Sequence, residues 1–272
     1  MKRPDENLTK FRSQIDDIDD KIISLLKERM AIVKQVGKHK SQTSATQSFI
    51  RAGREASMLR NLSRKADSIF PPAAIASIWR TIISTSLCTE QNMSISAYAT
   101  DKNHDCFWLA REYYGSFVKT HKTPSADEVI DNVSSGKTSI GILPIGDNSC
   151  TWWLRPENEQ NDIFIFARIP FVEDKKQPVP SAVAIANVMP EATDDDVSVF
   201  VATGFSMQSD IEKTFAQIGT TAKIIASKDN SYLIEADNFI DKNSENLSIL
   251  QKTVKSQQHI RLLGAYARPI SI

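Results

Sequence analysis

The sequence predicts a multidomain protein with an all-α intertwined helical dimer at the N-terminus, then a small α/β lobe and an α+β domain. Three observations support this. Residues 1–92 have helical apolar spacing throughout, with glycine at only two positions. Residues 93–175 switch to strands and helices that follow one another, as in a small α/β unit. Residues 176–272 end in strands and helices of βαββαβ order.

Composition narrows the class of protein. The 272 residues include 33 Lys plus Arg and 33 Asp plus Glu, so no charge excess favours nucleic acid or a membrane surface as partner. No apolar run approaches the roughly 20 residues of a membrane span. The start "MKRPDENLTK" lacks the apolar core of a signal peptide, and the three cysteines fit neither a metal spacing nor a disulfide framework. We therefore expect a cytoplasmic protein without a metal.

The first predicted helix spans residues 8–40 and would be roughly 50 Å long. Its apolar stripe continues through three- and four-residue steps. The members of this stripe are Phe11, Ile15, Ile18, Ile22, Leu25, Arg29, Ile32, Val36 and Lys40. A polar loop (41–48) leads to helices at 53–66 and 70–91, the latter with a proline suited to a first turn. One long and two short helices cannot enclose a core, so the stripe predicts a second copy as partner.

The elements after residue 92 follow from alternating and helical spacing. Ser125 is a plausible N-cap for one helix, because Glu128 follows three residues later. The predicted strands are 94–100, 138–146, 163–171, 182–188, 196–203, 221–227, 231–237 and 259–267. The predicted helices are 104–115, 125–137, 206–218 and 244–256, and residues 173–181 are a predicted linker.

Polar residues interrupt the apolar stripes of all three N-terminal helices. Burying an unpaired charge is expensive, so these groups need partners. Internal ion pairs of Arg29 and Lys40 with Glu55 and Glu90 are one explanation. The other is an external anion, because the cations outnumber the acids, and arginine binds carboxylates through two parallel hydrogen bonds. The cations are Arg12, Arg29, Lys40, Arg51 and Arg54, against Glu55 and Glu90.

The segments "LTKFRSQIDDIDDKIISLLKERMAIVKQVGKHK", "RAGREASMLRNL" and "IWRTIISTSLCTEQ" resemble the all-helical (type II) chorismate mutase family over about residues 8–91. The resemblance implies chorismate as substrate and a homodimer in which each site receives Arg12 from the other chain. It implies that Arg29 and this Arg12 hold the two carboxylates and that Ser86 supports one of them. Lys40 would bridge a carboxylate and the ether oxygen.

The resemblance also implies that Glu55 binds the ring hydroxyl, that Glu90 hydrogen-bonds the ether oxygen and that Arg54 belongs to the wall of the site. Arg51 stands where some members have aspartate, so its part in substrate binding stays open. The Claisen rearrangement of chorismate needs positioning and stabilisation of charge on the ether oxygen, and no cofactor. Glu90 can donate to that oxygen only as the acid, which burial beside substrate carboxylates would favour.

A second resemblance covers the rest of the chain. "GILPIGDNS" (141–149) resembles the substrate loop of prephenate dehydratases, and the segment closing with "IRLLGAYARP" (260–269) resembles their ACT domain. The domains expected are a chorismate mutase domain (1–92), a truncated dehydratase-like lobe (93–175) and an ACT-like domain (176–272). Too few residues separate "DNSC" from "IFIFAR" for a second lobe, and "DIF" replaces a Thr-Arg-Phe triplet. Dehydratase activity is therefore expected to be absent.

The ACT-like segment also departs from its family at two turns, "FSMQSDI" (205–211) and "ASKDN" (226–230). Amino-acid feedback, a dimerisation module and a vestigial scaffold remain alternatives for it. For the whole chain, the sequence favours a chorismate mutase. The rival is a catalytically silent regulatory or small-molecule-binding protein that uses the helical dimer for assembly. A scaffold has no need of six polar residues on buried faces, namely Arg12, Arg29, Lys40, Glu55, Ser86 and Glu90.

Overall fold

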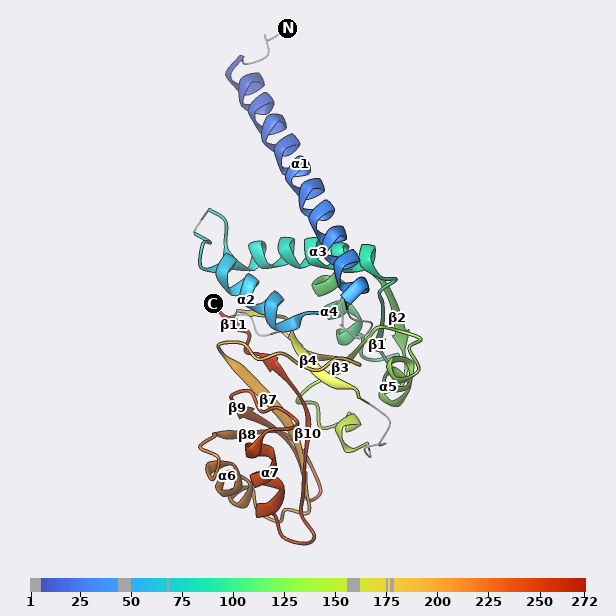
Figure 1. Cartoon of the computed structure of the whole chain (residues 1–272), viewed down its shortest axis with the longest axis vertical. Coiled ribbons are helices and arrows are strands. Elements are labelled where there is room, and N and C mark those ends of the chain that lie inside the picture. Colours follow the sequence, from blue (N-terminus) through green and yellow to red (C-terminus); the bar gives the residue numbers. More distant parts are fainter. Residues whose placement is uncertain (1–5, 44–49, 68, 156–161, 175, 177–178) are drawn as a thin grey trace.

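The N-terminal part of the chain consists of three helices, as predicted (Figure 1). The computed structural model describes residues 6–43, 50–67, 69–155, 162–174, 176 and 179–272. The helices are α1 (Glu6–Thr43), α2 (Ala52–Ser63) and α3 (Pro72–Glu90). The first helix continues past the predicted end at residue 40, and most of the predicted loop 41–48 lies outside the described residues.

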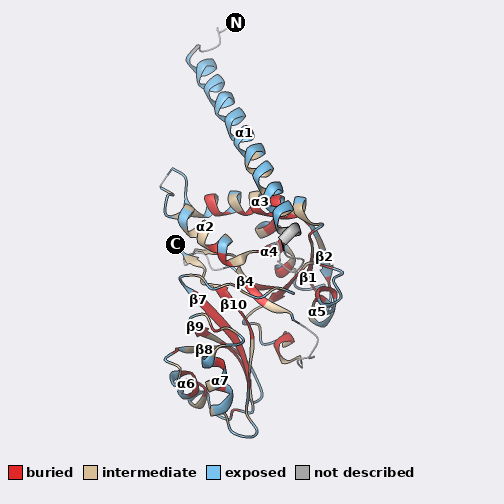
Figure 2. Cartoon of the chain, in the orientation of Figure 1, coloured by how far each residue is buried: buried red, intermediate tan, exposed pale blue. Residues whose placement is uncertain are grey.

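Most of α1 projects away from the rest of the molecule, and its C-terminal part packs against α3 (Figure 1). The apolar stripe on α1 is exposed along its length (Figure 2), with Phe11 at 58% and Leu25 at 63%. Such a stripe is costly to leave in water, so the single chain presents an uncovered face. Among the helices in the described part of the chain, none is both long and apolar enough to cross a bilayer.

The two shorter helices lie against the α/β body, by which we mean residues 93–272. Pro71 is extended and Pro72 occupies the first turn of α3, where a missing backbone N–H costs nothing. The buried side of α2 presents Ala56 and Leu59, which pack with Ala76 of α3 and with Phe171 of the body. These contacts hold α2 and α3 against the α/β body.

The α/β body is built on one nine-stranded sheet of order β2-β1-β3-β6-β4-β10-β7-β9-β8. The first part of the body comprises β1 (Ser94–Tyr98), α4 (Asp105–Tyr114), β2 (Lys119–Thr123), α5 (Ala126–Ser134), β3 (Ile140–Pro144), the 3-10 turn η1 (Trp152–Leu154), β4 (Phe164–Ile169) and β5 (Val172–Glu173), of which β5 lies outside the nine-stranded sheet. Ser125 caps α5 by accepting from the Glu128 backbone N–H at 3.3 Å, as predicted. Strand β2 was not predicted, because "KTHKT" is a mostly exposed, polar edge strand.

The remaining elements run to the end of the chain. They are β6 (Ala182–Ala186), β7 (Asp196–Thr203), α6 (Gln208–Ala216), β8 (Ala222–Lys228), β9 (Ser231–Asp237), α7 (Glu245–Thr253), β10 (His259–Ala267) and β11 (Ile270–Ser271). The predicted βαββαβ order from β7 to β10 is present, and these four strands pair antiparallel. Strand β6 lies between β3 and β4, so the sheet runs unbroken across the expected boundary between residues 175 and 176.

The two halves of the sheet meet where β10 runs beside β4. Gly264 of β10 pairs with Ile165 of β4, and it has a φ of +141°, which L side chains rarely adopt. A Cβ at this position would lie 2.2 Å from the Ile165 carbonyl oxygen. Glycine is therefore required for the backbones to approach closely enough to join the two half-sheets.

Candidate functional site

A pocket of about 510 Å3 lies between α1, α2 and α3. It collects six of the eight residues expected in the site: Arg29, Arg51, Arg54, Glu55, Ser86 and Glu90. Apolar side chains, among them Ile32 and Val36 of α1 and Ile83 and Leu87 of α3, form the rest of the wall. The helical spacing of the interrupted stripes brings these polar groups together, because the interruptions fall at the same level of the three helices.

Arg29 is a half-buried cation of the pocket. Its Nη1 donates to the Oγ of Ser86 at 2.8 Å, which links α1 to α3. Partial burial lowers the pKa of Arg29, and the positive charge of Arg54 lowers it further. In the part of the chain that the structure describes, no ion pair joins Arg29 or Arg54 to a carboxylate. Two neighbouring cations that form no ion pair with a described carboxylate make a place for an anion.

Glu55 has a partner that the sequence analysis did not identify. Its Oε2 accepts from Nη1 of Arg80 at 2.6 Å, and the Arg80 side chain is 4% exposed. The guanidinium lies over the ring of Tyr113, 4.1 Å from its centroid. A signal for Arg80 was present, since it interrupts a second apolar row on α3. That row is Ala76, Arg80, Ile83 and Leu87.

Arg51 differs from Arg29 and Arg54 because it is paired with an acid outside the pocket. It directly precedes α2 and forms an ion pair through its Nε with Glu191 of the α/β body. Arg60, two turns along α2, donates to the Oγ1 of Thr193 at 3.0 Å. A Cβ on Gly53 would lie 2.9 Å from the Cβ of Glu191, so α2 lies very close to this segment. The geometry therefore gives Arg51 a docking role beside its place in the pocket wall.

Of the remaining expected residues, Glu90 lines the pocket, whereas Arg12 does not. The carboxyl group of Glu90 lies against α1, because a Cβ on Gly37 would be 3.4 Å from Glu90 Oε1. Lys40 belongs to α1 one turn further on, but its side chain lies outside the described residues. Arg12 is exposed on the projecting part of α1 and is not part of this pocket.

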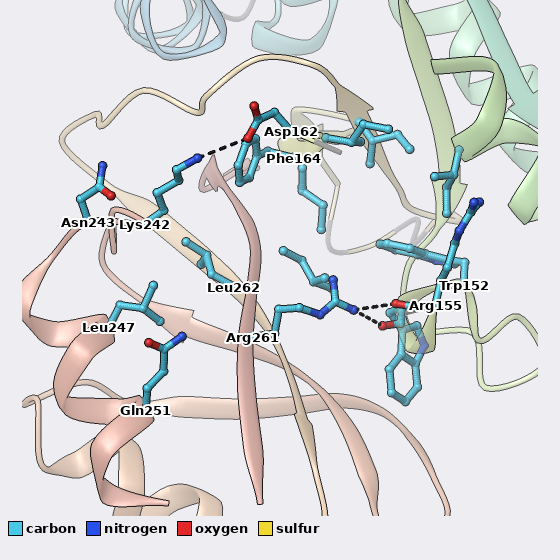
Figure 3. Close-up of a pocket in the computed structure, with 16 residues that line it drawn as sticks. Trp152, Arg155, Asp162, Phe164, Lys242, Asn243, Leu247, Gln251, Arg261 and Leu262 are labelled. Atoms are coloured by element: carbon cyan, nitrogen blue, oxygen red, sulfur yellow. Dashed lines mark hydrogen bonds and ion pairs between the residues drawn. The ribbon is translucent and has the colours of Figure 1, made fainter. Parts of the chain in front are cut away.

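A second cavity, of about 390 Å3, lies between the α5–η1 region, β4 and the α7–β10 end of the sheet (Figure 3). It also contains cations, but these are paired within the chain. Lys242 Nζ lies 3.3 Å from Asp162 Oδ1, and Arg155 Nη2 lies 2.7 Å from Asp131 Oδ1. Arg261 donates to the carbonyl oxygens of Trp153 and Arg155. Arg155 and Lys242 are therefore paired with carboxylates, in contrast to Arg29 and Arg54 of the helical pocket.

The side chains of the "DNS" stretch (147–149) form hydrogen bonds within the α/β body. Asn148 Oδ1 accepts from the Ser227 backbone N–H of β8 at 2.9 Å. The Ser149 hydroxyl donates to Asp147 Oδ1 at 2.6 Å. These polar groups hold their own loop and attach it to the neighbouring sheet half.

Comparison with known families confirms the resemblance of the N-terminal segment. Residues 11–91 match the model of the family described as chorismate mutase type II. The matched residues nearly coincide with residues 8–91, the segment whose sequence resembles this family.

Curated relatives that match this chain are named bifunctional chorismate mutase/prephenate dehydratase. The bifunctional chorismate mutase/prephenate dehydratase of Aquifex aeolicus is 30% identical over 144 residues, which cover 52% of this chain and 39% of the relative. That of Pseudomonas aeruginosa is 26% identical over 147 residues, covering 53% and 40%. The chain thus spans about 40% of the length of the curated relatives that it matches.

Two solved structures of prephenate dehydratases match part of this chain. The enzyme from Streptococcus mutans has a TM-score of 0.40 and 16% identity, covering 66% of this chain and 100% of that one. The enzyme from Arthrobacter aurescens, in complex with L-Phe, has a TM-score of 0.46 and 12% identity, covering 65% and 90%.

Proposed function

We propose that this protein is a chorismate mutase, which converts chorismate to prephenate. The observation that carries the proposal is the pair of cations Arg29 and Arg54, which lack a carboxylate partner in the described residues and share a pocket with Ser86 and Glu90. Chorismate is a dicarboxylate of a size that such a pocket can enclose. The match of residues 11–91 to the chorismate mutase type II family supports the same substrate.

The reaction is an intramolecular Claisen rearrangement, in which the ether C–O bond breaks while a C–C bond forms and no atom is lost. It requires the two reacting carbons to be held together, which is a positioning task. It also benefits from donors aimed at the ether oxygen, where negative charge grows. Side chains alone can supply both effects, so the proposal includes no cofactor.

Each polar residue of the pocket takes one part in this mechanism. Arg29, held by Ser86, binds one substrate carboxylate, and Arg54 completes the wall beside it. Glu90 donates to the ether oxygen in its protonated form, together with Lys40. Glu55 binds the ring hydroxyl through the carboxyl oxygen that Arg80 does not use.

The proposal includes a homodimer. The exposed apolar stripe of α1 needs a cover, and a second α1 supplies a matching face. In that arrangement Arg12 of the partner subunit reaches the pocket and binds the second carboxylate. The exposed position of Arg12 in the single chain supports this role.

The decisive experiment is an assay of the purified full chain with chorismate. The loss of chorismate absorbance is measured over time, and the product is identified as prephenate. Turnover abolished in the Arg29→Ala/Glu90→Ala double variant supports the proposal. A folded wild-type protein that leaves chorismate at its spontaneous rate would instead favour the silent binding protein.

We further propose that the chain lacks prephenate dehydratase activity. Asn148 and Ser149 are engaged in hydrogen bonds within the α/β body, and the sequence offers no second lobe to form a water-excluding cleft. Incubation with prephenate at neutral pH should therefore give phenylpyruvate only at the spontaneous rate. Enzyme-dependent phenylpyruvate that disappears in Asn148→Ala would contradict this part of the proposal.

The division into a mutase domain, a dehydratase-like lobe and an ACT-like domain is also part of the proposal. The β7–β10 unit, with its βαββαβ order, supports an ACT-like assignment for the last domain. The two turns by which ACT domains of this family bind an amino acid have other residues here (205–211 and 226–230). We therefore favour a role as a dimerisation module or a scaffold. Phenylalanine added to the mutase assay should accordingly leave kcat/KM unchanged.

A further inference from the structure

Arg80 connects the helical pocket to the α/β body. Its guanidinium contacts two rings of α4, lying 4.1 Å from the centroid of Tyr113 and 5.3 Å from that of Tyr114. On its other side it forms the ion pair with Glu55, whose side chain is 14% exposed. Glu55 lines both the helical pocket and the small cavity that holds these two rings. The carboxylate thus lies at the border between the pocket and the body.

The energy of folding does not explain an arginine at this place. A buried ion pair is often no more stabilising than apolar side chains of similar volume. Arg80 Nε and the Tyr114 hydroxyl have no hydrogen-bond partner in the described part of the chain, which adds to the cost. Burial disfavours the charged form of Arg80, but Tyr113 and Glu55 hold its pKa above the usual value. The partners of Arg80 therefore keep it charged, while two buried polar groups at this place, Arg80 Nε and the Tyr114 hydroxyl, stay unpaired.

The surroundings of Glu55 suggest what this cation does. A carboxylate that shares a pocket with Arg29 and Arg54 would be attracted to them, because neither forms an ion pair with a carboxylate among the described residues. Such a contact would neutralise the charge that an anionic ligand needs. In the structure the Glu55 carboxylate instead turns to Arg80, which is better placed to hold it, because it is buried and supported by the rings.

We propose that Arg80 is a positioning residue that draws Glu55 toward the α/β body and so keeps Arg29, with Arg54 beside it, available for a carboxylate of the substrate. This inference rests on the proposed function and adds a residue to it. It also makes Tyr113, from outside the matched segment 11–91, a support of the helical site.

The test compares kinetic constants of full-length variants with chorismate. Arg80→Met keeps the apolar contact with Tyr113 and releases Glu55, so KM should rise about tenfold or more, with a smaller fall in kcat. In a Glu55→Ala background the same change should have little further effect, because no carboxylate remains to be held. Tyr113→Leu should resemble Arg80→Met in a milder form, whereas Tyr113→Phe keeps the ring and should behave like wild type.

Arg168→Met is the matched control. Arg168 also forms an ion pair, 2.8 Å from Glu235, and is partly buried, but it belongs to the sheet. Its loss should lower the melting temperature without changing KM. The proposal is overturned if Arg80→Met lowers the melting temperature alone, or if its effect on KM is the same with and without Glu55. If Arg80→Met does not fold, Tyr113→Leu with unchanged KM overturns it. An inactive wild type would instead refute the proposed function.

Discussion

Arg29 and Arg51 both line the pocket between the three helices, but their charges have different surroundings. Arg29 donates to Ser86 and faces Arg54, whereas Arg51 is paired with Glu191. A carboxylate of the substrate should therefore gain more from Arg29. We expect Arg29→Ala to lower kcat/KM by about a hundredfold or more while the protein stays folded. Arg51→Ala should give a smaller loss, and equal losses in steady-state assays would contradict the assignment.

Glu90 should show its role in the pH profile. If the acid donates to the ether oxygen, its protonated form is the active one, so kcat/KM should rise as the pH falls from about 8 to about 5. Glu90→Gln keeps a donor without titrating. It should stay active and flatten the profile, whereas Glu90→Ala should be poor throughout. An unchanged slope in Glu90→Gln would leave Lys40 as the only donor.

Cys106 offers a readout of packing in the α/β body. Burial, aided by Cys150, raises the pKa of Cys106 to about 12. Because only the thiolate reacts, on the order of one Cys106 side chain in ten thousand is reactive at about pH 8. We expect Cys88, which is half-buried, to react first with a thiol reagent, and Cys106 to react only after unfolding. Mass spectrometry of the labelled protein would show the order.

At the scale of elements, Gly264 decides whether the two half-sheets can join. Gly264→Ala combines a φ of +141° with a Cβ placed 2.2 Å from the Ile165 carbonyl oxygen, a contact that only a backbone shift can relieve. We expect a loss of about 3 kcal/mol, which corresponds to a fall of roughly 5–10 °C in melting temperature. Gly136→Ala is the matched control, because Gly136 has a φ of +72° and nothing within 4 Å. It should cost about 1 kcal/mol, and equal shifts would argue against the close approach.

At the scale of the whole molecule, the projecting helix α1 predicts a site shared between two chains. Arg12→Ala and Arg29→Ala should each be nearly inactive as homodimers. After mixing and subunit exchange, a heterodimer holds one intact site, so about a quarter of the wild-type activity should return. Sedimentation should show dimers throughout. A tagged chain would show whether the two variants exchange subunits. If they exchange and activity does not return, Arg12 lies outside the site.

The sequence by itself determined the three helices, the later change to strands and the βαββαβ order, because these depend on local spacing and capping. Ser125 capped its helix as predicted, and six of the expected polar residues reached one pocket. A helix fixes which residues share a face, so interrupted stripes can be compared between helices before any fold is known.

The tertiary structure decided the partners of those residues. The ion pair of Glu55 with Arg80 joins α2 to α3, and the cation–π contact with Tyr113 joins the helices to the body. Arg51 forms an ion pair with Glu191, which lies 140 positions further along the chain. Strand β6 entered the sheet between β3 and β4, which local spacing cannot reveal because strand order depends on long-range pairing. Local pattern therefore determined which faces are polar, while packing between distant segments determined which charges remain available to a ligand.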